Sequence, residues 1–132
     1  MAEPSRPTQV VHRVLVVEDD YELADLLSEV LTYENYTADL AANGMEALEK
    51  LRGADYEAII CDLMMPLMDG ETFYNQATKQ FPYLADRFLF ITSQASRRGG
   101  FADFVFRTGN SLLEKPLEME KLRAALKELL QR

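Results

Sequence analysis

Five short apolar runs alternate with five segments of helical periodicity along this chain, and this alternation restricts its possible folds more than any other feature. The run Val14–Val17 is continuously apolar and mostly β-branched, which is typical of a strand buried on both faces of a parallel sheet. Four further strands are predicted, at residues 36–41, 58–62, 88–91 and 111–113. The alternation predicts an α/β fold: a single, doubly wound, five-stranded parallel sheet with helices on both faces. We expect the flavodoxin-like strand order 2-1-3-4-5.

The segments between the runs carry the apolar spacing of amphipathic helices. The first helix is predicted to follow Asp20, a candidate N-cap, and its apolar residues are Leu23, Leu26, Leu27, Val30 and Leu31. A helix from about Met45 to Gly53 follows, then one after Gly70 with Phe73, Ala77 and Phe81 inward, and a last one that buries Leu122, Ala125, Leu126, Leu129 and Leu130. In the short helix at 101–107, Phe101, Phe104 and Val105 are expected in the core, whereas Phe106 is a candidate for an exposed contact.

Composition limits the classes of function. The 132 residues suit one domain, and a hydrophobic content of 48% is enough for a core. The net charge of −8 argues against a general nucleic-acid surface, and no apolar run approaches the ~18 residues of a membrane helix. With no signal sequence and a single cysteine, Cys61, the chain is expected in the cytoplasm. Residues 1–11 are expected to be a flexible lead-in, and 12–132 the folded domain.

Polar residues stand at the carboxyl ends of four predicted strands. They are Glu18, Asp19 and Asp20 after the first strand, Asp62 at the end of the third, Thr92 and Ser93 after the fourth, and Lys115 after the fifth. In a doubly wound sheet these ends lie at one edge, where ligands bind. Carboxylates gathered there repel each other and favour a divalent cation, and oxygen ligands favour a hard ion such as Mg²⁺. The one histidine, His12, precedes the first strand and cannot complete a zinc site.

Asp62 is the candidate nucleophile of this site. A carboxylate can attack phosphorus and form an acyl phosphate, whose oxygens then need positive charge and hydrogen-bond donors. Lys115 offers a compact charge and Thr92 a hydroxyl donor, although Ser93 could donate in its place. Taken alone, Asp62 could simply be a turn or helix cap. Its convergence with Asp19, Thr92 and Lys115 favours the chemical role.

These motifs, in this order, resemble those of the receiver domain of bacterial response regulators. They are Val16-Val17-Glu18-Asp19-Asp20, the stretch from Asp62 to Gly70, Ile91-Thr92-Ser93 and Lys115-Pro116, and the match runs from about residue 12 to the carboxyl end. The resemblance implies that Asp62 is the phosphoacceptor, Thr92 the switch hydroxyl and Lys115 the phosphate contact. It also implies Mg²⁺ as the cofactor, bound by Glu18, Asp19, Asp62 and the backbone carbonyl of Met64.

The resemblance further implies a phosphorylation-controlled signalling switch. Such a domain takes its phosphoryl group from a sensor histidine kinase or phosphotransfer protein. It then acts on a partner, an attached effector or a second copy of itself, with no direct contact to nucleic acid or membrane. It catalyses only its own phosphorylation and dephosphorylation, so it is not expected to be an enzyme in the usual sense. This chain departs from the family on the output side, because Leu112 stands three residues before Lys115, where many members carry Tyr or Phe.

Two other classes of function fit parts of the pattern. An aspartate-nucleophile phosphohydrolase acting on small phosphates typically carries a second Asp two residues after the first, and Met64 occupies that position here. A flavodoxin-like cofactor binder needs phosphate-cradling Gly, Ser or Thr after the first strand, where this chain has acids. The phosphohydrolase is therefore the alternative to the signalling switch.

Overall fold

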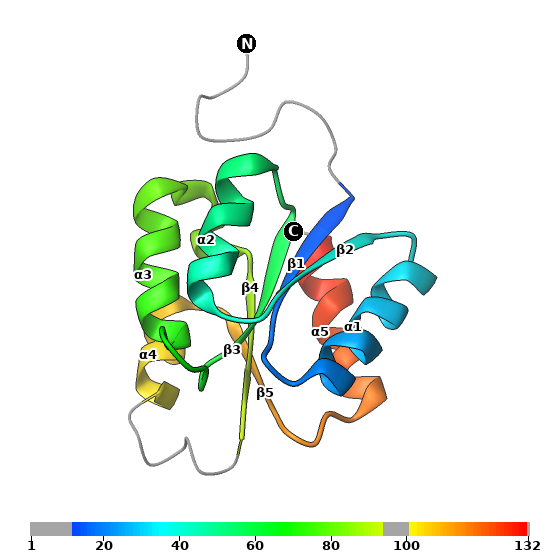
Figure 1. Cartoon of the computed structure of the whole chain (residues 1–132). Coiled ribbons are helices and arrows are strands. Elements are labelled where there is room, and N and C mark those ends of the chain that lie inside the picture. The colour runs from blue at the N-terminus through cyan, green and yellow to red at the C-terminus, as the bar shows by residue number, and fades with distance from the viewer. Residues whose placement is uncertain (1–11, 94–100, 132) are drawn as a thin grey trace.

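The five predicted strands form one parallel sheet. The structure is a computed structural model that describes residues 12–93 and 101–131. Its strands are ordered β2-β1-β3-β4-β5 as predicted, with β2 at an edge. Their bounds are Arg13–Val17 for β1, Thr37–Ala41 for β2, Ala58–Asp62 for β3, Phe88–Thr92 for β4 and Ser111–Glu114 for β5. In Figure 1 the helices flank this sheet on two sides.

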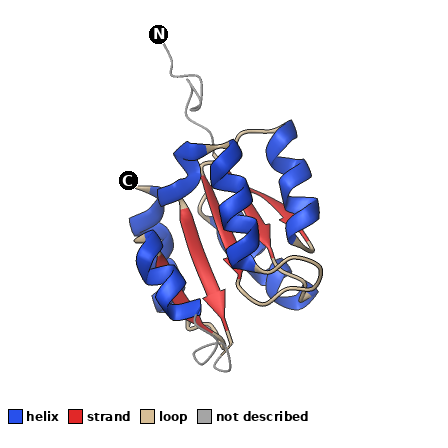
Figure 2. Ribbon diagram, turned by 90° about the vertical axis from the view of Figure 1, so that its left-hand side faces the viewer, coloured by secondary structure: helices blue, strands red, loops and turns tan. Residues whose placement is uncertain are grey.

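Two helical layers cover the sheet, one on each face, as Figures 1 and 2 show. On one face lie α1 (Tyr21–Tyr33) and α5 (Met119–Leu130), and on the other α2 (Gly44–Gly53), α3 (Gly70–Gln80) and α4 (Phe101–Thr108). A short 3-10 helix, η1 (Pro82–Asp86), joins α3 to β4. Each layer buries its own apolar cluster against the sheet. Strand residues alternate between the clusters, so Cys61 lies in the α2–α4 cluster and Ile60 in the other.

Polar caps fix the points at which three helices leave the carboxyl edge of the sheet. Asp20 accepts hydrogen bonds from the backbone N–H groups of Glu22 and Leu23, which confirms it as the N-cap of α1. Asn43 caps α2, and Asp69 caps α3 by accepting from the N–H of Thr72. These side chains satisfy N–H groups that the first helical turn leaves without partners. The caps therefore fix where the loops at the carboxyl edge of the sheet end and the helices begin.

The burial of the helices follows the predicted faces, with exceptions at their margins. Leu26 and Met45 are exposed, and Ala24 instead completes the buried stripe of α1. Phe81, Ala125 and Leu130 are only partly buried and pack against the edges of the two clusters. Phe104 and Val105 are buried, Phe101 packs beside them, and Phe106 is 85% exposed, as predicted.

Several predictions from sequence fall outside the described residues. They concern the lead-in at residues 1–11, a break in the loop predicted at Gly99-Gly100, the position of Gln94 beside the predicted site, and the exposure to solvent predicted for Arg97 and Arg98. Within the described ranges, none of the helices has the length and the apolar content that crossing a bilayer requires.

Gly70 should be hard to replace, because α3 starts against the backbone of β3. A Cβ atom at Gly70 would lie 2.8 Å from Leu63 Cα and 2.9 Å from the Asp62 carbonyl oxygen. Since neither backbone atom can move freely, Gly70→Ala should lower the free energy of unfolding by about 2 kcal/mol. Gly53→Ala is the matched control, because a Cβ there would meet nothing within 4 Å. Urea denaturation of both variants is the measurement, and equal stability would contradict this account.

Candidate functional site

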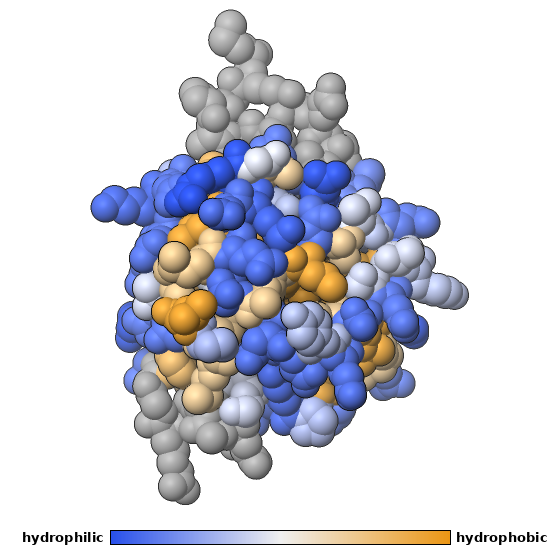
Figure 3. Space-filling model, viewed as in Figure 1, coloured by the Kyte–Doolittle hydropathy of each residue, from blue (hydrophilic) through white to orange (hydrophobic). Residues whose placement is uncertain are grey.

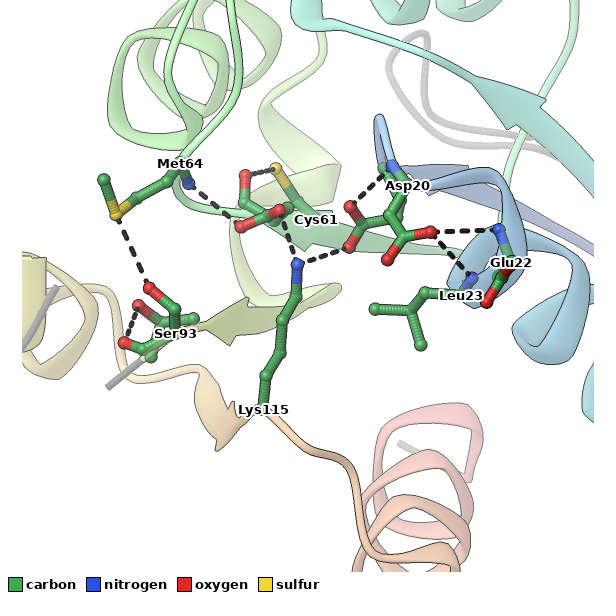
Figure 4. A network of polar contacts seen from close by, with 10 residues as sticks. Asp20, Glu22, Leu23, Cys61, Met64, Ser93 and Lys115 are labelled. Atoms are coloured by element: carbon green, nitrogen blue, oxygen red, sulfur yellow. Dashed lines mark hydrogen bonds and ion pairs between the residues drawn. The ribbon is translucent and has the colours of Figure 1, made fainter. Parts of the chain in front are cut away.

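Side chains from three strand ends meet at the carboxyl edge of the sheet. Asp62 is the last residue of β3, while Glu18 and Lys115 directly follow β1 and β5. Figure 4 shows the Lys115 side chain reaching up from the end of β5 to carboxylates that come from the other two strands. Its Nζ lies 2.9 Å from Asp62 Oδ2 and 3.1 Å from Glu18 Oε1. The parallel register thus brings together residues that are far apart in the sequence.

Both of these carboxylates are buried. Glu18 and Asp62 are each 3% exposed, whereas Asp19 is exposed. Burial, followed by the negative charge of Asp62, raises the pKa of Glu18 to about 7 despite the opposing effect of Lys115. Burial alone would lower the pKa of Lys115, but its hydrogen bond to Asp62 and its ion pairs with Asp62 and Glu18 raise that pKa overall. Lys115 therefore stays positively charged. Its single positive charge does not neutralise the negative charges of both Asp62 and Glu18.

The donor set fits a hard divalent cation. Carboxylate oxygens of Glu18, Asp19 and Asp62 all lie within 4.8 Å of one another. Glu18 Oε2 accepts the backbone N–H of Asp20, but buried Oε1 accepts no hydrogen bond of good geometry even though Lys115 is near. The ion pair with Lys115 places a positive charge beside this buried oxygen but gives it no directed hydrogen bond, so the oxygen can still bind a metal ion. The cluster, made of oxygen donors alone, is therefore able to hold a metal ion of the Mg²⁺ or Ca²⁺ class.

The loops beside Asp62 provide further polar contacts. The backbone N–H of Met64 donates to Asp62 Oδ1 at 3.0 Å, so both oxygens of Asp62 are held in place. The Thr92 hydroxyl donates to the Ser93 carbonyl at 3.1 Å. The Ser93 hydroxyl in turn lies 3.8 Å from Met64 Sδ, a contact drawn at the left of Figure 4. Thr92 is thus at the predicted strand end, but its hydroxyl hydrogen is directed to a backbone oxygen.

Cys61 takes no part in the site. It is fully buried in the α2–α4 cluster, on the face that strand alternation assigns to it, and its Sγ–H donates to the Asp62 carbonyl at 3.3 Å. Burial, then the charge of Asp62, raises the pKa of its thiol well above the ordinary value, so it stays protonated. Asp20 likewise remains a helix cap, but its N–H also orients Glu18. That contact was not predicted, since sequence alone does not show backbone donors.

At this edge the Asp62 carboxylate is held in place beside the Lys115 cation. The acidic cluster that includes Asp62 is open to solvent at Asp19. A carboxylate held in this way can act as a nucleophile, and Lys115 can take up negative charge that develops on a bound group. No second Asp stands at the position of Met64 to act as a general acid.

Comparisons with known proteins agree with this geometry. The family model described as response regulator receiver domain matches residues 14–127. Response regulator MprA of Mycobacterium ulcerans is 32% identical over 120 residues, which are 91% of this chain and 50% of MprA. Transcriptional regulatory protein TcrA of Mycobacterium tuberculosis is 31% identical over 125 residues, 91% of this chain and 46% of TcrA. The chain therefore spans about half the length of the curated relatives it matches.

Solved structures show the same fold. A putative response regulator from Chloroflexus aurantiacus is 33% identical with a TM-score of 0.79, covering 93% of this chain and 100% of that one. Response regulator TrrA from Thermotoga maritima, solved in complex with Mg(2+)-BeF, is 28% identical with a TM-score of 0.76 and covers 91% and 100% of the two chains.

Proposed function

Because this chain belongs to the response regulator receiver domain family, whose members are phosphorylation-controlled signalling switches, we propose that Asp62 is its phosphoacceptor. The donor is a sensor histidine kinase or a phosphotransfer protein. The observation that supports this most directly is the position of Lys115, whose Nζ lies between the buried carboxylates of Asp62 and Glu18. A nucleophile, a fixed cation and a cluster suited to a metal stand within one ion-pair network.

In the reaction, an oxygen of Asp62 forms a bond to phosphorus while the bond from phosphorus to the donor breaks, and its electron pair leaves with the donor. Lys115 stabilises the charge on the transferred group, and the Met64 N–H keeps the Asp62 carboxylate oriented. Mg²⁺, held by Glu18, Asp19 and Asp62, would supply further positive charge next to the phosphoryl oxygens. The Met64 carbonyl remains a predicted fourth ligand.

The switch follows from a change of partner by Thr92. A phosphoryl group on Asp62 offers the Thr92 hydroxyl a charged acceptor in place of the Ser93 carbonyl, and a charge-assisted hydrogen bond is the stronger one. Rotation towards Asp62 would loosen the end of β4 and the Ser93 contact to Met64. The phosphoryl group thereby favours a second arrangement of this edge.

The test uses a small-molecule donor, so that no partner is needed. Wild-type protein is incubated with acetyl phosphate and Mg²⁺, and its intact mass and peptide map are measured. We expect one phosphoryl group, located on Asp62, and none when the metal is chelated. No incorporation, or incorporation on another residue, would refute the proposal. Sustained release of phosphate over many turnovers would favour the phosphohydrolase instead.

Lys115→Met should slow phosphoryl incorporation by about 100-fold, because it removes the cation that faces the transferred group. Lys121→Met is the matched control, since Lys121 is exposed and its ion pair is with Glu118 in the same helix region. The time course of incorporation from acetyl phosphate measures both variants. Equal rates in the Lys115 variant and wild type would remove Lys115 from the mechanism.

Other parts of the function stay predictions. They are a sensor histidine kinase or phosphotransfer protein as the partner, a homodimer or an attached effector, the absence of direct nucleic-acid binding and of other enzymatic activity, and a cytoplasmic location.

A further inference from the structure

A groove lies between the last turns of α1 and α5, towards the edge of the sheet opposite to Asp62. It measures about 450 Å³ and is lined by residues from the ends of both helices and by Tyr36, which directly precedes β2. Both helices start near the carboxyl edge of the sheet and lie next to each other in Figure 1, so the groove is separate from the candidate phosphorylation site. Its volume is within the range of roughly 300–1,000 Å³ that small-molecule sites occupy.

The floor of the groove is apolar and already formed. It consists of side chains that pack in or against the cluster between the sheet, α1 and α5, namely Val30, Leu31, Leu126 and Leu130. Tyr36 also lines the groove, and its ring meets that of His12 edge-on with 5.7 Å between the centroids. Figure 3 shows mainly hydrophilic side chains on the side where Figure 1 has α1, with apolar surface in small patches. The groove thus offers an apolar ligand a surface that the rest of this side does not.

Two cations stand on the α5 side of this groove. Arg123 and Lys127 are four residues apart, so they share one face of the helix, and both are exposed. Neither forms an ion pair with any residue in the described ranges. A cation in the last turn of a helix is favourable, which accounts for Lys127, but Arg123 lies outside that turn. Since like charges at this spacing repel each other, the fold itself gains little from the pair.

The remaining polar lining is mixed. Glu34, the C-cap of α1, places one carboxylate on the opposite side of the groove. The hydroxyl of Tyr36 and the amide of Gln131 can each donate a hydrogen bond, as Arg123 and Lys127 do. Four groups that donate and two positive charges thus face one negative charge, so the lining favours an anionic ligand over a cationic one.

We propose that the groove binds a medium-chain carboxylate, whose chain lies on the apolar floor and whose head group pairs with Arg123 and Lys127. The guanidinium of Arg123 matches the two oxygens of a carboxylate, and Lys127 adds a point charge. In a chain of net charge −8 the overall field does not attract an anion, so recognition depends on these two side chains. The proposal does not rest on the phosphorylation of Asp62.

The probe is octanoate, titrated into the isotope-labelled protein and followed by amide chemical shifts. We expect a saturable one-to-one response centred on the ends of α1 and α5. Octanol and octylamine, which carry the same chain with a neutral and a positive head group, should bind about fivefold more weakly or worse. Arg123→Gln combined with Lys127→Gln should weaken octanoate binding about tenfold, and Glu34→Gln should tighten it about threefold, because it removes a repulsion. Leu130→Gln, at the partly buried edge of the floor, should also weaken it.

Lys79→Gln combined with Lys121→Gln is the matched control, since it changes the net charge equally at two exposed positions that do not line the groove. This variant should bind octanoate like wild type, and an equal loss in both double variants would overturn the proposal. Unchanged binding without Arg123 and Lys127 would also overturn it, as would shifts centred outside the groove or octylamine binding as tightly as octanoate. A dimer of the free protein that octanoate dissociates would assign the groove to a second copy of the chain instead.

Discussion

Asp62→Asn should abolish phosphoryl incorporation from acetyl phosphate completely. The amide oxygen of Asn is neutral and does not form a stable acyl phosphate, whereas the carboxylate does. The fold should survive, because the amide oxygen can still accept the Met64 N–H, and Lys115 keeps its ion pair with Glu18. Intact mass spectrometry after incubation with donor and Mg²⁺ measures the loss, and circular dichroism confirms the folded state.

Asp69→Asn is the control for removal of a nearby negative charge. Asp69 lies in the same loop and caps α3 through the Thr72 N–H, a task that Asn performs equally well. This variant should be labelled like wild type. Labelling of Asp62→Asn at another residue would mean that the acceptor is wrong, and loss of labelling in both variants would mean that the loop, not the Asp62 carboxylate, is being tested.

The strand ends were predictable because they depend on a short-range pattern. The run Ala58–Asp62 ends in a carboxylate and was predicted with its observed bounds, since its apolar residues admit no other element of that length. Parallel pairing then forces Glu18, Asp62 and Lys115 to one edge whatever the loops do. The convergence of these side chains follows from topology.

Side-chain direction and backbone strain were not predictable in the same way. The Thr92 hydroxyl can rotate to several acceptors, and only the packed loop decides that it donates to Ser93. The positive φ of Leu67 also has no signal in the sequence, because the surrounding turn imposes it on a residue that does not favour it. Such features depend on contacts between loops, and one sequence does not specify these.

Leu112 shows how a departure from the family is accommodated. It is partly buried, pairs with Phe90 in the register of β4 and β5, and packs against the α2–α4 cluster. The ring of Phe90 lies 5.5 Å from that of Phe104 in α4 and 5.8 Å from that of Tyr74 in α3. A shift at the end of β4 would therefore meet aromatic side chains of the helices, even though β5 supplies none at position 112.

Glu18→Gln should stabilise the metal-free protein above neutral pH. Folding raises the pKa of Glu18 from 4.5 to about 7, so between these values the folded state binds more protons than the unfolded chain. The stability that this group contributes is present below pH 4.5 and is lost as pH rises through 7. The loss is on the order of 3 kcal/mol, because one pKa unit corresponds to about 1.4 kcal/mol.

Glutamine cannot ionise, so the variant should lack this decline and exceed wild type by up to about 3 kcal/mol at pH 8. Glu18→Gln also removes the ion pair with Lys115, but this loss does not make the variant less stable than wild type at pH 8. The pKa of about 7 already includes that ion pair, and Lys115 keeps its ion pair with Asp62. Glu49→Gln, an exposed position in α2, should leave the pH profile unchanged. Urea denaturation from pH 4 to 8 in chelator measures all three proteins, and a wild-type stability that rises across this window would contradict the account.

Added Mg²⁺ should reverse the ranking of the two proteins, and this links the stability of the fold to the proposed chemistry. A cation that binds only the folded state stabilises it by about 4.1 kcal/mol at one thousand times its dissociation constant, which exceeds the advantage of the variant. Wild type, with the carboxylates of Glu18, Asp19 and Asp62, should gain this at pH 8, while Glu18→Gln should gain much less. The negative charge of Glu18, which destabilises the metal-free protein, is then the charge that binds the metal ion. An equal gain in both proteins would exclude Glu18 from the metal site.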